Sequence, residues 1–526
     1  MNARQPRLSG VIGAVHPAVL HRRVHDALLI GLTGLIPAAI ALGIIVKIPD
    51  ASLENMALVL AAIVAVLGIA ALVASSRLEV TVTLLALYLL LLYGPVKLGL
   101  GGGELAHGAD DVLVLAICVG AVMRLMVRRE PVKLPPLFGW VLAFVGTVAL
   151  EAFNPKTGGI LKVLGGFRQE LHWVPFFFFG YLLIRSKKRI RQAFLIAGVC
   201  ALANGVAATY QTGLSPSQLA TWGPGYRELF QPTSVGKKGA AGRVYAAEGG
   251  THPRPVGLGS DGGFSGGVGL IALPFCLALL ATWRSRRRWV AAVLALGAIA
   301  GVATGAGRLQ VVGAVLSVVA FLLLASVGGR RLKRPLGALL IVLALAIPLG
   351  VVFVSVVREG AFSRYGTFEN TSASTIATHK SSAWTKIPSF LARNPFGIGL
   401  GTTGPVGNFG GKSIGQGEGG GASAETQYNF IADELGAPGL VVWVTLSVYI
   451  VVLVARRLRA VRDGELAILL AGAFAPFIGL IFMGFSGPSL TSTALGPYFW
   501  FAIGIAAYWF AGRAHDAQST VAAGGE

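Results

Sequence analysis

The chain has 526 residues, of which 54% are hydrophobic and only 13% are charged. Soluble domains carry about a quarter charged residues, so a single soluble domain of this length is excluded. In a soluble protein, a net charge of +21 is typical of nucleic-acid binding. In a membrane protein, basic residues also concentrate in the cytoplasmic loops, so the distribution of the charge along the chain decides how it is interpreted.

Fourteen apolar stretches are bounded by charge, proline or glycine, and nearly all are long enough to cross a hydrocarbon core of roughly 30 Å. The predicted fold class is therefore all-α, a polytopic transmembrane helical bundle of about 12–14 helices with two long extracytoplasmic loops. The predicted helices cover residues 27–46, 56–74, 80–98, 111–127, 134–152, 171–184, 192–210, 263–282, 289–307, 309–327, 336–356, 438–455, 465–484 and 495–511.

Three of these stretches have an unusual position or length. The first, 27–46, lacks a small-residue cleavage pattern before Lys47, so we expect a retained helix and not a signal peptide. The stretch 171–184 has only 14 residues and many aromatics, which favours a tilted or re-entrant helix. Residues 289–327 are too long for one crossing, and a tight turn is predicted at residues 305–307.

The distribution of charge follows this map when the N-terminus is placed in the cytoplasm. The inside loops then hold 27 of the 44 Lys and Arg residues but only 7 of the 23 acids. The basic clusters 185–191, 284–288, 330–334 and 456–462 all fall on that side, as the positive-inside rule requires. We therefore predict that both termini are cytoplasmic and expect no nucleic-acid partner.

The long loops divide the chain into five segments. Loops above about 15 residues are usually functional or disordered, so chemistry is expected on the outer face. The segments are N-terminal transmembrane helices (1–210), a first long outer loop (211–262), central transmembrane helices (263–357), a second long outer loop carrying the active site (358–437), and C-terminal transmembrane helices with a cytoplasmic tail (438–526).

The sequence gives little support for cofactor or metal chemistry. Residues 257–262 and 399–404 match the glycine pattern of dinucleotide sites, but neither lies between a predicted strand and a helix. The sequence has no HExxH and no P-loop. Cys118, Cys200 and Cys276 all lie inside apolar stretches, so no disulfide framework is predicted. We expect no cofactor and no metal.

Two segments carry a family resemblance. Residues 393–401 read Arg-Asn-Pro-Phe-Gly-Ile-Gly-Leu-Gly, and residues 425–440 read Glu-Thr-Gln-Tyr-Asn-Phe-Ile-Ala-Asp-Glu-Leu-Gly-Ala-Pro-Gly-Leu. Their order and spacing resemble the O-antigen ligase and polymerase family, which shows an Asn-Pro-Leu-x-Gly-x-Gly-x-Gly type segment, then His-Asn-x-Tyr and a Glu-Leu-Gly-x-Pro-Gly-Leu helix entry. Residues 303–308 and 254–257 are similar to two further family elements. The resemblance runs loosely over residues 150–510, and only 393–440 is specific.

The resemblance implies transfer of a glycan from a polyprenyl diphosphate to an acceptor hydroxyl at the outer face of the bacterial inner membrane. The implied partners are the lipid-linked glycan, a glycan or lipid acceptor, and membrane lipids. Glu425 and Thr426 stand where the family often has His, so a ligase and a polymerase both remain open. The alternative is a transporter of envelope precursors or lipids. It is less favoured because Lys97, Arg124 and Glu151 lie near the ends of apolar stretches.

A diphosphate leaving group needs its developing charge neutralised, and Arg does this with two parallel hydrogen bonds. Arg308, between two apolar stretches, is the first candidate, followed by Arg254 and Arg168. The alternatives are an interfacial anchor for Arg308, a solvated charge for Arg254, and for Arg168 a pairing with Glu170.

The acceptor hydroxyl needs a base to take its proton. Glu425 is the first candidate and His379 the second, with a helix N-cap or first-turn carboxylate and a surface histidine as the alternatives. The glycines of 397–421 favour either close approach to the diphosphate or loop flexibility. The remaining residues assigned to substrate binding are Lys380, Arg393, Gly399, Gly401 and Tyr428.

Overall fold

The computed structural model describes residues 78–99, 134–231, 244–247, 250–305, 307–327, 333–356, 384–404, 426–485 and 492–512, with isolated positions at 113–123 and 487–489. The chain forms two compact units, residues 1–81 with 112–132, and residues 82–111 with 133–526. Apart from Leu78–Thr81, the helices and strands named below belong to the second unit.

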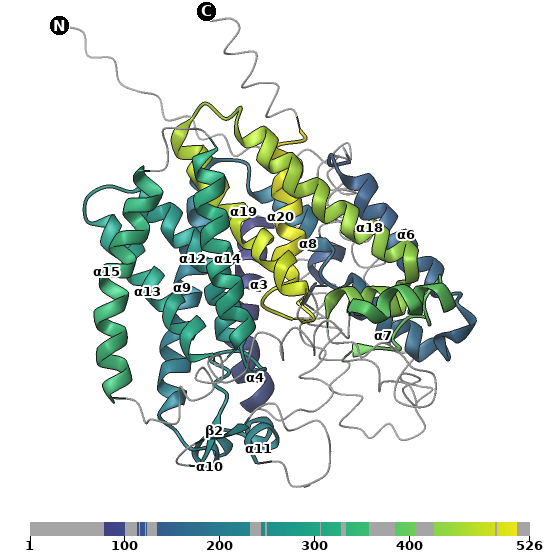
Figure 1. The fold of residues 1–526 in the computed structure, drawn as a ribbon, viewed down its shortest axis with the longest axis horizontal. Helices are drawn as coiled ribbons and strands as arrows, with labels where there is room; N and C mark the ends of the chain where they lie inside the picture. Colours follow the sequence, from purple (N-terminus) through teal and green to yellow (C-terminus); the bar gives the residue numbers. More distant parts are fainter. Residues whose placement is uncertain are drawn as a thin grey trace, which may run out of the picture. The chain divides into compact units, whose positions relative to one another are not determined.

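Nearly all the regular structure of the described residues is helical (Figure 1). In this part of the chain seven helices are long and apolar enough to cross a membrane, which confirms the prediction of a mostly helical protein and indicates a membrane protein. They are Leu78–Gly99, α9 (Lys187–Thr212), α12 (Phe264–Thr282), α13 (Arg287–Thr304), α14 (Arg308–Ser326), α18 (Gln427–Leu458) and α19 (Gly464–Gly484).

Other predicted stretches form α6 (Phe138–Glu151), α15 (Lys333–Val356) and α20 (Gly496–Trp509). Residues 27–46 and 56–74 and most of 111–127 lie outside the described residues. The predicted turn at 305–307 is confirmed, because α13 ends at Thr304 and α14 begins at Arg308.

Two helices differ from the prediction. The stretch 171–184 forms only the nine-residue α8 (Pro175–Leu183), which packs closely on α20. A Cβ at Gly180 would lie 2.1 Å from the carbonyl oxygen of Phe501, so glycine allows this approach. In the region between the predicted helices 134–152 and 171–184, residues Ile160–Leu171 form α7, whose buried face carries Lys162, Gly165, Gly166 and Glu170.

The core of the unit is α12. Every residue from Phe264 to Ala281 is buried, and the helix packs against α9, α13, α14, α15 and α19. A helix that is apolar all round is expected to lie inside a bundle, as this one does. Small residues also let two neighbours of α12, namely α9 and α13, approach each other closely. A Cβ at Gly205 of α9 would lie 2.1 Å from the carbonyl oxygen of Gly297 in α13.

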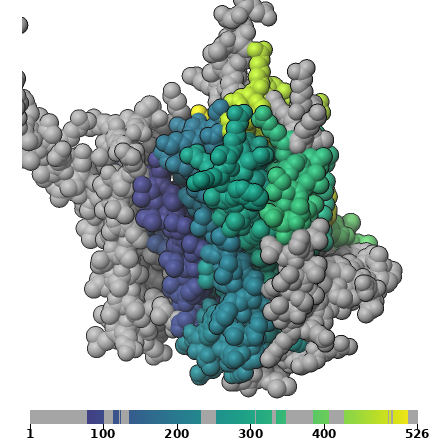
Figure 2. Space-filling model, turned by 90° about the vertical axis from the view of Figure 1, so that its left-hand side faces the viewer, coloured from purple at the N-terminus to yellow at the C-terminus, as the bar shows by residue number. Residues whose placement is uncertain are grey.

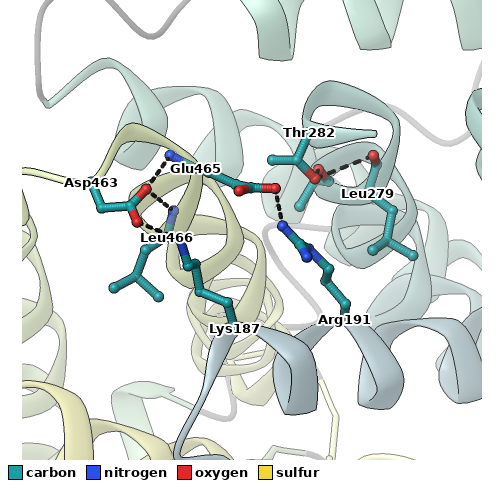
Figure 3. Close-up of polar contacts among 8 residues, drawn as sticks. Lys187, Arg191, Leu279, Thr282, Asp463, Glu465 and Leu466 are labelled. Atoms are coloured by element: carbon teal, nitrogen blue, oxygen red, sulfur yellow. Dashed lines mark hydrogen bonds and ion pairs between the residues drawn. The ribbon is translucent and has the colours of Figure 1, made fainter. Parts of the chain in front are cut away.

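Ion pairs join two of the basic loops (Figure 3). Lys187 Nζ lies 2.6 Å from Asp463 Oδ2, and Arg191 pairs with Glu465. Asp463 also caps α19, because its Oδ1 accepts hydrogen bonds from the backbone N–H groups of Glu465 and Leu466 at 3.0 and 3.1 Å. The predicted basic clusters 185–191 and 456–462 therefore lie at the same end of the bundle.

The other end of α9 carries a small cap. It consists of α10 (Pro216–Ala220), α11 (Pro224–Phe230) and an antiparallel hairpin of β1 (Val244–Ala247) and β2 (Gly250–Pro253). These elements lie at the lower end of the ribbon in Figure 1, which corresponds to the lower end of the coloured atoms in Figure 2. A hydrophobic cluster holds it together, formed by Leu98, Leu219, Tyr226, Phe230 and Val256.

Two buried polar residues of α9 hold the chain that leaves this hairpin. Gln211 Oε1 accepts hydrogen bonds from the N–H groups of Val256 and Gly257 at 3.0 and 2.8 Å. Asn204 Oδ1 accepts a further hydrogen bond from Leu258 N–H at 3.0 Å. Buried amide side chains thus replace water for these backbone groups, and they fix the segment that begins with Arg254.

Candidate functional site at the break in α18

Helix α18 is broken at Gly436, whose φ of 62° and ψ of −159° are not helical. Residues 394–404 dock at this break. Ile398 N–H donates to the carbonyl oxygen of Asp433 at 2.7 Å, and Ala437 N–H donates to that of Pro395 at 2.7 Å. The docked segment therefore satisfies backbone groups that the break leaves without helical partners. The two sequence segments that carry the family resemblance meet here.

Four glycines allow this docking, namely Gly397, Gly399, Gly401 and Gly404, all with φ between 65° and 93°. A Cβ at Gly399 would lie 2.3 Å from Thr157 Oγ1, and a Cβ at Gly401 would lie 2.3 Å from the carbonyl oxygen of Lys162. Positive φ and close packing within the chain explain these two glycines without a ligand. Their assignment to substrate binding stays a prediction.

Replacing Gly436 with Ala tests whether the break holds residues 394–404. The new Cβ would lie 2.4 Å from the carbonyl oxygen of Pro395, in a backbone conformation that costs about 1–3 kcal/mol for a residue other than glycine. We expect faster hydrogen exchange across 394–404 in the variant. Gly146→Ala in α6 is the matched control, because nothing lies within 4 Å of its Cβ position. Equal exchange in both variants would contradict this role.

Buried acids lie beneath the docked segment. The side chain of Glu434 is fully buried, and its Oε1 accepts hydrogen bonds from Thr403 N–H at 3.0 Å, Thr403 Oγ1–H at 2.9 Å and Gln169 Nε2–H at 3.2 Å. Asp433 is also fully buried, and Glu170 on α7 is 8% exposed. Glu434 therefore joins three segments that are distant in the sequence. We call Glu170, Asp433 and Glu434 the acid cluster.

Among the described residues, the acid cluster has more buried carboxyl groups than buried cations. Lys162 on α7 is 2% exposed, and burial lowers its pKa while the charge of Glu434 opposes that change. Burial, and secondly the neighbouring Glu434 carboxylate, raise the pKa of Glu170 to about 8. The side chain of Gln169 only partly offsets this by hydrogen bonding. Site prediction from the sequence missed the cluster, although adjacent Asp and Glu residues at the start of an apolar helix were a usable signal.

The structure brings Arg254 and the start of α14, the helix that Arg308 begins, to one turn. The side chain of Arg254 lies 3.3 Å from the Cβ position of Gly262, and Gln310 Nε2 lies 2.7 Å from that of Gly263. Gln310 belongs to the first turn of α14, which Arg308 begins. Arg254 therefore lies beside Gly262, and the first turn of the helix that Arg308 begins packs against Gly263. A cation at a helix N-terminus is unfavourable for the helix dipole, so helix stability does not explain Arg308.

The other described candidates have varied surroundings. Arg168 lies on α7, beside Gln169. Arg393 is the last residue of a helix over 384–393, and its Nε donates to the carbonyl oxygen of Ser389 at 3.2 Å. Tyr428 is 6% exposed and packs against the rings of Trp384 and Phe485, with centroid distances of 5.1 and 4.7 Å. Packing among aromatic rings is therefore sufficient to explain Tyr428, and its assignment to substrate binding stays a prediction.

The candidate bases Glu425 and His379, with Lys380, lie outside the described residues. The first described residue of this segment, Thr426, is the N-cap of α18, and its side chain accepts a hydrogen bond from Asn429 N–H at 3.1 Å. Thr426 thus fills the N-cap position of α18.

No group of three or more His, Cys, Asp or Glu residues that could hold a metal ion occurs among the described residues. Comparison with known proteins gives no assignment either: no protein-family model matches the chain, and no curated protein matches it. The function is therefore argued from the residues.

Proposed function

We propose that this protein transfers a glycan from a polyprenyl diphosphate to an acceptor hydroxyl at the outer face of the bacterial inner membrane, as a ligase or polymerase in cell-surface polysaccharide biosynthesis. The observation that carries the proposal is that the side chain of Arg254 and the first turn of α14, which Arg308 begins, both lie against the Gly262–Gly263 turn. Two guanidinium groups that reach one diphosphate suit it, because each can form two parallel hydrogen bonds with phosphate oxygens.

The length of α18 supports a site at the membrane surface. The part of α18 after the break, from Ala437 to Leu458, is about 33 Å long at about 1.5 Å per residue, which matches a hydrocarbon core of roughly 30 Å. Gly436 would then lie at one surface, and the basic segment 456–462 at the other. The positive-inside rule assigns that basic segment to the cytoplasm and the break to the outer surface.

The transfer step uses residues in two roles. The acceptor oxygen forms a bond to the anomeric carbon of the donor sugar as the bond from that carbon to the diphosphate oxygen breaks. The electron pair leaves with the diphosphate, whose charge Arg308 and Arg254 stabilise. The proton of the acceptor hydroxyl passes to the carboxylate of Glu425, with His379 as the second candidate. The proposal includes no cofactor.

A transporter of envelope precursors is the second candidate, and the break in α18 beside buried carboxylates favours it, because secondary transporters use discontinuous helices. Transporter sites usually lie near the bilayer midplane, whereas here a full membrane-spanning length follows the break. We therefore place the transferase first.

Cells that lack the protein distinguish the two functions. Loss of a transferase should leave lipid-linked glycan on the outer leaflet, where an added lectin reaches it in spheroplasts. Loss of a transporter should leave the glycan inaccessible until the membrane is permeabilised. Unchanged levels of lipid-linked glycan would contradict both proposals.

The proposed orientation predicts a pattern of cysteine labelling. In a background without Cys118, Cys200 and Cys276, Ser413→Cys should react with an impermeant maleimide in intact spheroplasts. Ser285→Cys, beside the basic cluster 284–288, should react only after permeabilisation. Labelling of Ser285→Cys but not of Ser413→Cys in intact spheroplasts would overturn the topology.

A further inference from the structure

The acid cluster has more buried oxygens than hydrogen-bond donors. Both carboxylate oxygens of Asp433 and Oε2 of Glu434 are buried and accept no hydrogen bond from the described residues. Asp433 and Glu434 are both fully buried. An ionised carboxylate that has lost water and gained no donor is strongly disfavoured, and such a group takes up a proton instead.

Charged groups on the adjoining elements do not balance the cluster. Lys162 is the buried cation there, and it interacts with Glu434. The other charged or titratable groups of α7, the end of α6 and the segment before the docked loop are Glu151, Lys156, Arg168, His172 and Arg393. Of these, Lys156, Arg168 and Arg393 are exposed, so their charges are screened by water. Among the residues that the structure describes here, one buried cation therefore faces the three buried acids of the cluster.

We propose that Asp433, Glu434 and Glu170 form a proton-binding site that retains at least one proton at neutral pH and thereby keeps α7 and residues 394–404 docked on α18. The proton removes one of the buried like charges, and a protonated carboxyl can donate a hydrogen bond to a neighbouring carboxylate. The site takes no part in the transfer step above, and its test does not depend on enzymatic activity.

The pH dependence follows from tighter proton binding in the docked state. The pKa of Glu170 is raised from 4.5 to about 8, so between these values the docked state keeps a proton that the undocked state has lost. The stability of docking therefore falls as the pH rises through this window. Above it, the acids carry uncompensated charge and repel one another.

Infrared spectroscopy of the purified full-length protein tests the site directly. Titration from about pH 5 to pH 10 should show the carbonyl-stretch band of a protonated carboxyl group at pH 7, lost with a midpoint near pH 8. Glu170→Gln, Asp433→Asn and Glu434→Gln, which nearly preserve side-chain shape, should each change the band or its midpoint. Glu228→Gln, at an exposed position on α11, should change neither.

Hydrogen exchange at residues 394–404 provides the second measurement. Above pH 8 the wild-type protein should exchange faster there than Glu170→Gln at the same pH, because only the wild type gains a charge on residue 170. Absence of the protonated-carboxyl band from the wild type at pH 7 would overturn the proposal. So would a band that all three variants leave unchanged.

Discussion

Glu425→Gln is expected to lower the turnover rate about 10²- to 10⁴-fold at saturating donor, the usual contribution of a positioned proton acceptor. Gln is nearly isosteric with Glu but cannot take the proton of the acceptor hydroxyl. Because Thr426 caps α18, the substitution does not remove the helix cap, and donor binding should be preserved. Turnover by the reconstituted full-length protein, measured with the donor affinity, checks this expectation.

Two further variants sharpen the test. Glu425→His should recover part of the rate, because imidazole also accepts a proton and the resembled family often has His at this position. Thr426→Ala should weaken the start of α18 by about 1 kcal/mol and leave the turnover of the folded protein nearly unchanged. Full turnover in Glu425→Gln would show that Glu425 is not the base, and His379 would become the first candidate.

Arg308→Lys is expected to reduce transfer about 10²- to 10³-fold, comparable to the loss of one preorganised donor from a catalytic site. Lysine keeps the charge but cannot form two parallel hydrogen bonds, so Arg308→Ala should lose at least as much. Arg227→Lys is the matched control, because Arg227 is an exposed residue of α11 in the same outer segment. Initial rates at several donor concentrations measure the effect.

A double-mutant cycle asks whether Arg254 and Arg308 hold one diphosphate. If they do, Arg254→Lys and Arg308→Lys should be non-additive by about 0.5–3 kcal/mol, as found for residues that share a partner. Additive effects would mean that the arginines act separately. A normal rate for both Arg308→Lys and Arg308→Ala would make Arg308 an interfacial anchor.

Much of the bundle could be predicted from the sequence because membrane-spanning helices require long apolar stretches. The turn at 305–307 followed from length, since residues 289–327 exceed one crossing. Helix α7 could not be found in this way, and α8 is shorter than the predicted stretch 171–184. The amphipathic α7 carries Lys162, Arg168 and Glu170 and has no long apolar run, and α8 ends after nine residues.

The candidate site was predicted only in part. The sequence motifs identified residues 393–401 and 425–440, but not that the first segment docks at Gly436 in the second. The acid cluster could not be predicted from spacing, because Glu170 lies more than 260 positions before Glu434 and tertiary packing brings them together. The role of Gly399 and Gly401 depends on positive φ and on neighbours in α7 and the turn before it.

A transfer assay in proteoliposomes tests the central claim most directly. The full-length protein is supplied with a polyprenyl-diphosphate-linked glycan and candidate acceptors, and the products are separated by chain length. We predict transfer by the wild type and its loss in Arg308→Ala, with one addition for a ligase and a ladder of products for a polymerase. Movement of the lipid-linked glycan across the bilayer, without transfer to any acceptor, would contradict the assignment and identify a transporter.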